Sequence, residues 1–223
     1  MIGYTFVMHR PRLAFLLTLP AVVLLATACL PPYEGPTGGR KAVILGDSII
    51  FETGFSGALT TTFHGRNWQT SAEAVIGSST GSHMGSIVKA PGMQSEVVIL
   101  NHATTDVNGV LFGAIVSKPA LRENVRVALT AALDTLAGVP CVVVVTATNN
   151  AITPGFNAEA NLHNAMLVGA VQAHPNATWL DWGAWSAGHP EWFRSADGVH
   201  LTGAGTLALA NIMEQTAASC GAW

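Results

Sequence analysis

Short apolar runs alternate with longer amphipathic stretches along this chain. The apolar runs lie at 41–45, about 71–76, 96–100, 139–146 and 177–180. Several of them are rich in valine and isoleucine, as buried parallel strands are. The stretches between them predict helices at 119–137, about 157–171 and about 202–218. Strands that alternate with helices in this way predict a parallel α/β sandwich of about five strands.

The first 28 residues have the layout of a secretory signal. A basic start precedes the uncharged stretch 13–33, and the small residues Ala-Thr-Ala at 26–28 are suited to cleavage. A retained membrane anchor is the alternative, since roughly 20 apolar residues span a bilayer. Pro20 inside the run favours the signal peptide. Cys29 follows directly, and we expect it to carry a lipid or to begin a freely secreted protein, although the match to a lipid-attachment motif is imperfect.

Composition after cleavage indicates one soluble domain. Without residues 1–28, eight Lys and Arg stand against 13 Asp and Glu, a formal charge of −5. Such a chain has no electrostatic case for binding nucleic acid. We expect a Pro/Gly-rich tether at 29–39 and a single domain at 40–223, a size that folds as one unit. We also expect a monomer, whose one membrane contact would be a lipid on Cys29.

Two further cysteines, Cys141 and Cys220, fall near the start of a predicted strand and at the end of the last predicted helix. An exported compartment permits them to form a disulfide. Two buried free thiols are the alternative, because sequence gives no distance between them.

Ser48 stands where a nucleophile would be placed in such a sheet. The strand KAVIL runs directly into Gly46-Asp47-Ser48, and functional groups of parallel sheets gather beyond the carboxyl ends of the strands. A helix that begins just after Ser48 would aim free backbone amides at a developing oxyanion. A Gly-Asp-Ser turn on its own is more often only a helix cap.

Asp197 and His200 supply the partner groups about 150 residues later, directly before the last predicted helix. A serine hydroxyl needs a base to accept its proton. A histidine held by a carboxylate is such a base near neutral pH, and a spacing of three residues lets one short loop supply both groups. We therefore expect Ser48, His200 and Asp197 to form a catalytic triad.

These motifs together resemble the SGNH/GDSL hydrolase superfamily over the whole of the expected domain. Gly46-Asp47-Ser48 matches the first block of the family, Gly77 matches the second, and Asp197 with His200 matches the last. The resemblance implies a three-layer α/β/α, flavodoxin-like fold and an oxyanion hole that includes the backbone amides of Ser48 and Gly77. The stretch 180–205 is particularly similar to the SGNH domains of bacterial polysaccharide O-acyltransferases, which suggests O-acylated envelope glycans as substrates.

One block departs from the family pattern. Family members end the third strand with an asparagine that donates into the oxyanion hole, and here Thr105 takes that place in an ungapped comparison. Asn101 carries the right amide but comes earlier, on the strand itself. Losing one such donor typically costs about 100- to 1,000-fold in turnover. Thr105 is therefore an uncertain third donor, and Asn101 is the alternative.

A second serine also satisfies a nucleophile pattern. Residues 77–81 read Gly-Ser-Ser-Thr-Gly, the G-x-S-x-G of an α/β-hydrolase elbow with Ser79 as nucleophile. Only two predicted strands precede it, and this reading leaves the Gly-Asp-Ser motif unexplained. We therefore favour Ser48.

Trp185 and Trp192, in the loop that leads to Asp197, are candidates for contact with a sugar ring or acyl chain. The histidines show no metal-ligand spacing, and the sequence implies no metal or cofactor.

The expected function is thus an exported serine ester hydrolase or acyltransferase. A weakly active or inactive envelope glycan-binding lipoprotein is the alternative. Thr105 favours this alternative, and the joint presence of Ser48, Asp197 and His200 opposes it.

Overall fold

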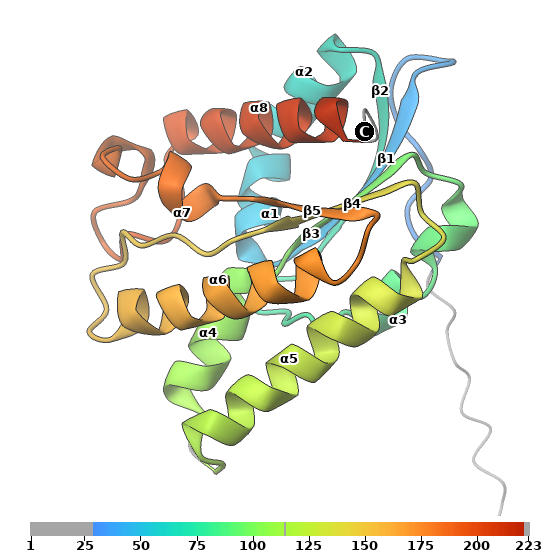
Figure 1. The fold of residues 1–223 in the computed structure, drawn as a ribbon. Coiled ribbons are helices and arrows are strands. Elements are labelled where there is room, and N and C mark those ends of the chain that lie inside the picture. Colours follow the sequence, from blue (N-terminus) through green and yellow to red (C-terminus); the bar gives the residue numbers. More distant parts are fainter. Residues whose placement is uncertain (1–28, 114, 221–223) are drawn as a thin grey trace, which may run out of the picture.

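Five parallel strands form the centre of the protein in the order β2-β1-β3-β4-β5 (Figure 1). The computed structural model describes residues 29–113 and 115–220. The strands are β1 (Arg40–Gly46), β2 (Trp68–Ala74), β3 (Val97–Asn101), β4 (Cys141–Val145) and β5 (Ala177–Leu180). Each predicted strand is present, with ends that differ from the expected ones by at most three residues. Every residue of β3 and β4 is buried, which explains why these strands carry uninterrupted apolar runs.

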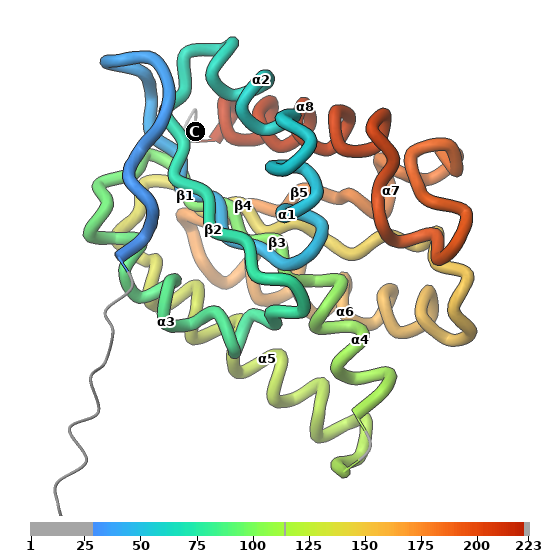
Figure 2. Tube along the Cα trace, turned by 180° about the vertical axis from the view of Figure 1, so that it is seen from behind, coloured from blue at the N-terminus to red at the C-terminus, as the bar shows by residue number. Residues whose placement is uncertain are grey.

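Helices cover both faces of the sheet, which gives the predicted three-layer α/β/α sandwich. Figures 1 and 2 show α1, α2 and α8 on one face and α3, α4, α5 and α6 on the other. The first group comprises α1 (Ser48–Phe55), α2 (Ala58–Gly65) and α8 (Gly203–Ser219). The second comprises α3 (Met84–Ile87), α4 (Ala103–Phe112), α5 (Lys118–Thr135) and α6 (Phe156–Gln172). The short α7 (Trp182–Trp185) follows β5.

The predicted helices at 119–137, 157–171 and 202–218 correspond to α5, α6 and α8. The helices α1, α2 and α4 had no specific sequence prediction beyond the expectation of a helix after Ser48. They are short, and their sequences are rich in threonine and glycine, which lower helix propensity. Packing against the sheet decides their structure.

Residues 29–39 are attached to the domain, whereas we expected a tether. Glu34 forms an isolated antiparallel bridge with Thr70 of β2, and the Ser71 hydroxyl donates to the carbonyl of Pro31 at 2.6 Å. The segment therefore covers the free edge of β2, where unpaired backbone groups would otherwise face water.

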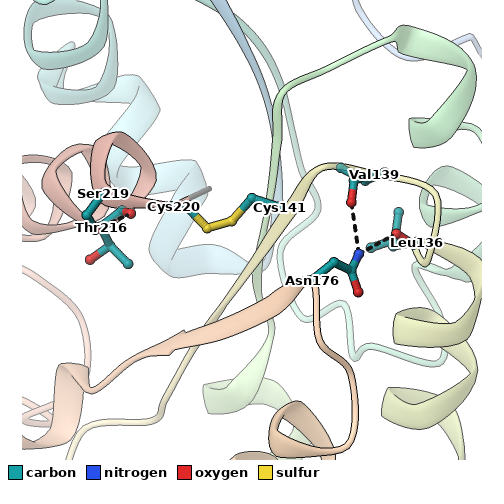
Figure 3. Close-up of a disulfide and its surroundings, with 7 residues drawn as sticks. All are labelled: Leu136, Val139, Cys141, Asn176, Thr216, Ser219 and Cys220. Atoms are coloured by element: carbon teal, nitrogen blue, oxygen red, sulfur yellow. Dashed lines mark hydrogen bonds between the residues drawn. A yellow bond between two sulfur atoms is a disulfide. The ribbon is translucent and has the colours of Figure 1, made fainter. Parts of the chain in front are cut away.

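Cys141 and Cys220 are joined by a disulfide (Figure 3). Their Cα atoms lie 5.9 Å apart, so the bond ties the end of α8 to the first residue of β4. Cys29 is an exposed free thiol. The signal peptide expected at 1–28 lies outside the described residues, and no helix within 29–113 or 115–220 is long and apolar enough to cross a membrane.

Candidate active site

Ser48 begins α1 directly after the turn that ends β1. Gly46 is required in that turn, because a Cβ there would collide with the side chain of Ile50 and approach the carbonyl of Asn101 to 2.9 Å. The buried Asp47 carboxylate caps the helix by accepting the backbone N–H of Ile49 at 3.0 Å. Strand, glycine turn and cap together fix Ser48 at the carboxyl edge of the sheet.

The structure brings Ser48, His200 and Asp197 into one hydrogen-bonded chain. His200 Nε2 lies 3.2 Å from Ser48 Oγ, and His200 Nδ1 lies 2.7 Å from Asp197 Oδ2. These contacts have the order nucleophile, base and orienting carboxylate that proton transfer from a serine requires.

The Asp197 carboxylate is held by its own loop. Its Oδ1 accepts the backbone N–H groups of Val199 and His200 at 2.8 and 2.9 Å. Partial burial acts to raise the pKa of Asp197, but these bonds and the His200 side chain outweigh it and hold the pKa below its ordinary value. Asp197 therefore stays ionised at neutral pH and orients the imidazole.

Gly198 lets this loop pass close to the segment after β4. It has a φ of +67°, and a Cβ at this position would collide with the carbonyl of Asn150. The loop is also bonded across this contact, because Ile152 donates its N–H to the Asp197 carbonyl at 3.0 Å. A side chain at residue 198 would therefore displace both Asp197 and His200.

Two backbone amides are available for an oxyanion hole. Ser48 is the first residue of α1, where a helix leaves its N–H groups without partners. Gly77 lies in the turn after β2 with a φ of +75°. Among the described residues, neither backbone N–H donates to another backbone carbonyl. Both amides were expected from the sequence to serve this purpose.

Thr105 lies against Asp47 on the first turn of α4. Its hydroxyl and its backbone N–H both donate to Asp47 Oδ2, at 3.0 and 3.1 Å. The proton that an oxyanion would need from this hydroxyl is thus already given to a buried carboxylate. In this arrangement Thr105 supports the cap of α1, a contact that sequence comparison did not reveal.

A buried pair of histidines lies at the same edge of the sheet. His102 follows Asn101 at the end of β3, and its Nε2 lies 2.7 Å from His83 Nδ1. His83 also lies 3.4 Å from the Ser78 hydroxyl and 3.3 Å from Glu73 Oε1. Burial, assisted by the nearby His83, lowers the pKa of His102 to about 3, so this imidazole is neutral at physiological pH.

Asn101, the alternative oxyanion donor, is buried and pairs with Gly46 across the sheet. Its carbonyl accepts the backbone N–H of Asp47 at 3.0 Å. Ser79, the rival nucleophile, is half-buried, and its hydroxyl bonds to the hydroxyl and the backbone N–H of Ser82 at 3.1 and 3.2 Å. His200 contacts Ser48 and not Ser79.

A pocket of about 360 Å³ opens beside Ser48 and His200. Its lining includes Phe51, Phe55 and Ile76 but neither Trp185 nor Trp192. Trp192 stacks on Trp182 and His189 at centroid distances of 5.6 and 3.9 Å, and Trp185 is exposed on α7. The pocket thus has a different aromatic lining from the one we predicted, because the loop of residues 181–193 packs against itself and α8.

No group of three or more His, Cys, Asp and Glu side chains within the described part of the chain could hold a metal ion.

The sequence matches no protein-family model and no curated protein. Solved structures with a similar fold include an α/β hydrolase from the metagenome of Lake Arreo, Spain, at a TM-score of 0.62 and 16% identity, covering 82% of this chain and 96% of that one. An acetylxylan esterase from Geobacillus stearothermophilus has a TM-score of 0.64 and 13% identity, and the match covers 82% of this chain and 95% of that one. The acetyl xylan esterase AlAXEase has a TM-score of 0.62 and 15% identity, and the match covers 79% of this chain and 98% of that one. At this identity the likeness shows a shared fold.

Proposed function

We propose that the protein is a serine-dependent carboxylic ester hydrolase whose nucleophile is Ser48. The observation that carries the proposal is the continuous chain from Ser48 Oγ through His200 to Asp197, at 3.2 and 2.7 Å, beside an open pocket. The structurally similar proteins named above include esterases, and structures of the Geobacillus enzyme have been solved as catalytic mutants of a serine, an aspartate and a histidine. These likenesses support the proposed reaction class.

The reaction follows from this geometry in two halves. Ser48 Oγ attacks the ester carbonyl while His200 Nε2 accepts the hydroxyl proton, and the backbone amides of Ser48 and Gly77 stabilise the oxyanion. His200 then gives the proton to the departing alcohol, which leaves an acyl group on Ser48. Water repeats the sequence with the same proton acceptor, releases the acid and restores the free hydroxyl. Transfer to a second alcohol in place of water would make the protein an acyltransferase.

The test is turnover of p-nitrophenyl acetate by the purified protein and by Ser48→Ala, His200→Ala and Ser79→Ala. Ser48→Ala and His200→Ala should each lose at least about 1,000-fold in kcat, with circular dichroism unchanged. Ser79→Ala is the matched control and should keep most of the activity. A fully active Ser48→Ala variant together with an inactive Ser79→Ala variant would transfer the role of nucleophile to Ser79.

Export and anchoring belong to the same proposal. The basic and apolar leader supports secretion, and Cys29 is exposed next to it. A lipid on Cys29 would tether the domain to the envelope. Radioactive palmitate should then label the exported protein but not its Cys29→Ser variant. Unlabelled protein that is free in the medium and begins at Cys29 would leave simple secretion.

The rival proposal is a glycan-binding protein without catalysis, and the single observation that favours it is the engagement of the Thr105 hydroxyl by Asp47. An O-acetylated envelope glycan as substrate also remains a prediction from the sequence. Binding of such a glycan by a protein with no esterase activity would favour the rival.

A further inference from the structure

Three large apolar side chains stand exposed around the nucleophile. Phe55 is 87% exposed, Ile76 66% and Phe51 43%, and all three line the pocket that contains Ser48. Phe51 and Phe55 follow Ser48 by three and seven residues, so Ser48, Phe51 and Phe55 lie on one face of α1. Ile76 comes from the turn after β2. We call Phe51, Phe55 and Ile76 the apolar wall.

The two phenyl rings of this wall are stacked on each other. Their centroids lie 6.2 Å apart and their planes differ by 9°. The same rings also border a second hollow, of about 260 Å³, whose other lining residues are Ile50, Gly54, Leu59, Ala72 and Ala74. The apolar surface thus continues from the nucleophile pocket past both rings, along a track lined mostly by apolar side chains.

Apart from Ser48 and His200, most polar side chains that line the nucleophile pocket already bond within the protein. The hydroxyls of Ser56, Thr202 and Thr206 donate their protons to the carbonyls of Thr53, Glu191 and Gly203, each at 2.9 Å. The two charged residues of the lining, Glu52 and Arg194, form an ion pair at 2.8 Å. A sugar ring needs several free hydrogen-bond donors and acceptors as well as an aromatic face. The three hydroxyls have no free proton to donate to a sugar, because each already donates to a backbone carbonyl.

From this distribution we infer that the substrate is an ester with a hydrocarbon chain, and that the chain lies on the apolar wall. The inference rests on the proposed function, because Ser48 and His200 fix where the ester carbonyl sits. Water leaves both the chain and the exposed phenyl rings when they meet, which stabilises the bound state. The chain belongs either to the acyl group or to the alcohol, and both present the same chemistry to the wall.

Two series of esters test the inference and separate the two sources of the chain. The acyl series is p-nitrophenyl acetate, butyrate and hexanoate, and the alcohol series is ethyl, butyl and hexyl acetate. We expect kcat/KM to rise in one series by up to about fourfold per methylene. The series in which it rises identifies the part of the ester that contacts the wall.

Variants of the wall give the sharper readout. Phe55→Ala should lower the ratio of kcat/KM for the longest to the shortest ester of that series by about tenfold. Phe55→Leu keeps an apolar side chain but removes the aromatic face, so it should preserve the ratio within about twofold. Phe112→Ala is the matched control, because Phe112 on α4 is 64% exposed and lines neither hollow.

Three outcomes would overturn the inference while leaving the esterase intact. One is Ser48-dependent hydrolysis in which acetate and ethyl esters are the best substrates. The second is a ratio that Phe55→Ala does not change. The third is a higher kcat/KM for acetylated xylo-oligosaccharide than for any alkyl ester, together with an equal loss of that kcat/KM in Phe55→Leu and Phe55→Ala. This result would show that the Phe55 ring stacks on a sugar. Hydrolysis of no ester at all would contradict the proposed function itself.

Discussion

Glu52, four residues after Ser48 on α1, accepts the backbone N–H of Leu201 at 3.1 Å through Oε2. Its Oε1 pairs with Arg194 at 2.8 Å, and Arg194 in turn donates its Nε–H to the Leu201 carbonyl at 3.1 Å. One carboxylate on the nucleophile helix therefore holds the residue next to His200. We therefore expect this contact to help set the distance between Ser48 Oγ and His200 Nε2.

We predict that Glu52→Ala lowers kcat at least about tenfold with little change in KM, because misplacing the base by a fraction of an ångström weakens proton transfer more than substrate binding. The free energy of unfolding should fall by about 1–3 kcal/mol, since the N–H of Leu201 loses its acceptor. Glu52→Gln keeps an acceptor oxygen and should recover part of kcat. Steady-state kinetics and urea unfolding measure both effects, and wild-type kcat in Glu52→Ala would show that the loop holds His200 without help.

Thr105→Val should separate the two roles considered for this residue. The change removes the hydroxyl but keeps the backbone N–H that also donates to Asp47. Because the hydroxyl donates to Asp47, we expect the free energy of unfolding to fall by about 1–3 kcal/mol. The decrease in kcat should be much smaller than the roughly 100-fold decrease that is typical of a lost oxyanion donor. A 100-fold fall in kcat with unchanged stability would mean that the hydroxyl turns to the oxyanion during catalysis.

Thr105→Asn loses the hydroxyl bond to Asp47 but places an amide where the family pattern has one, and kcat should rise more than tenfold where that amide donates to the oxyanion. Asn101→Ala measured on the same ester is the companion variant. Activity that stays level in Thr105→Asn but collapses in Asn101→Ala would assign the third donor to Asn101.

Asp106 makes stability depend on pH in a defined direction. Burial raises its pKa to about 6, although the hydroxyl and N–H of Thr80 donate to its carboxylate at 2.6 and 3.0 Å and act to lower it. In the unfolded chain its pKa is about 3.9. Between these values the folded state holds a proton that the unfolded state has released, so the contribution of Asp106 to stability is fully present below about pH 4 and is lost as pH rises through about 6.

The loss assigned to Asp106 should reach about 3 kcal/mol at most. Asp106→Asn cannot titrate, and its amide can still bond to the Thr80 hydroxyl. The difference in the free energy of unfolding between wild type and Asp106→Asn, measured in urea from pH 4 to 7.5, should therefore change with pH in this direction. A constant difference would mean that Asp106 is ionised throughout this range.

The disulfide should contribute most of its effect through the unfolded chain. Cys141 and Cys220 are separated by 79 positions, a loop for which the chain-entropy model gives roughly 4 kcal/mol. Cys141→Ala should lower the free energy of unfolding by about that amount, whereas Cys29→Ser should leave it unchanged. Mass spectrometry of the unreduced protein gives a direct check, and two alkylatable thiols besides Cys29 would contradict the pairing.

Local patterns predicted the strands, and the combination of two short motifs in one resemblance predicted Ser48, Asp197 and His200 as a triad. Buried strands such as β4 consist of apolar residues because both of their faces are covered. Ser48 directly follows a strand, and Asp197 and His200 share a single loop, so short sequence motifs record both placements. The short helices α1, α2 and α4 left weaker patterns, since packing determines them more than helix propensity does.

The sequence by itself therefore determined the layered fold and predicted Ser48, His200 and Asp197 as a triad, because short motifs mark each of these residues even though Ser48 and His200 lie 152 positions apart. Only the tertiary structure decided which aromatic side chains reach the pocket, what the Thr105 hydroxyl bonds to and how Glu52 holds the loop of His200. The Glu52 contact joins residues 149 positions apart, and the pocket wall comes from α1 and the turn after β2. Such contacts depend on how loops pass over the sheet edge, and no local pattern of residues encodes that path.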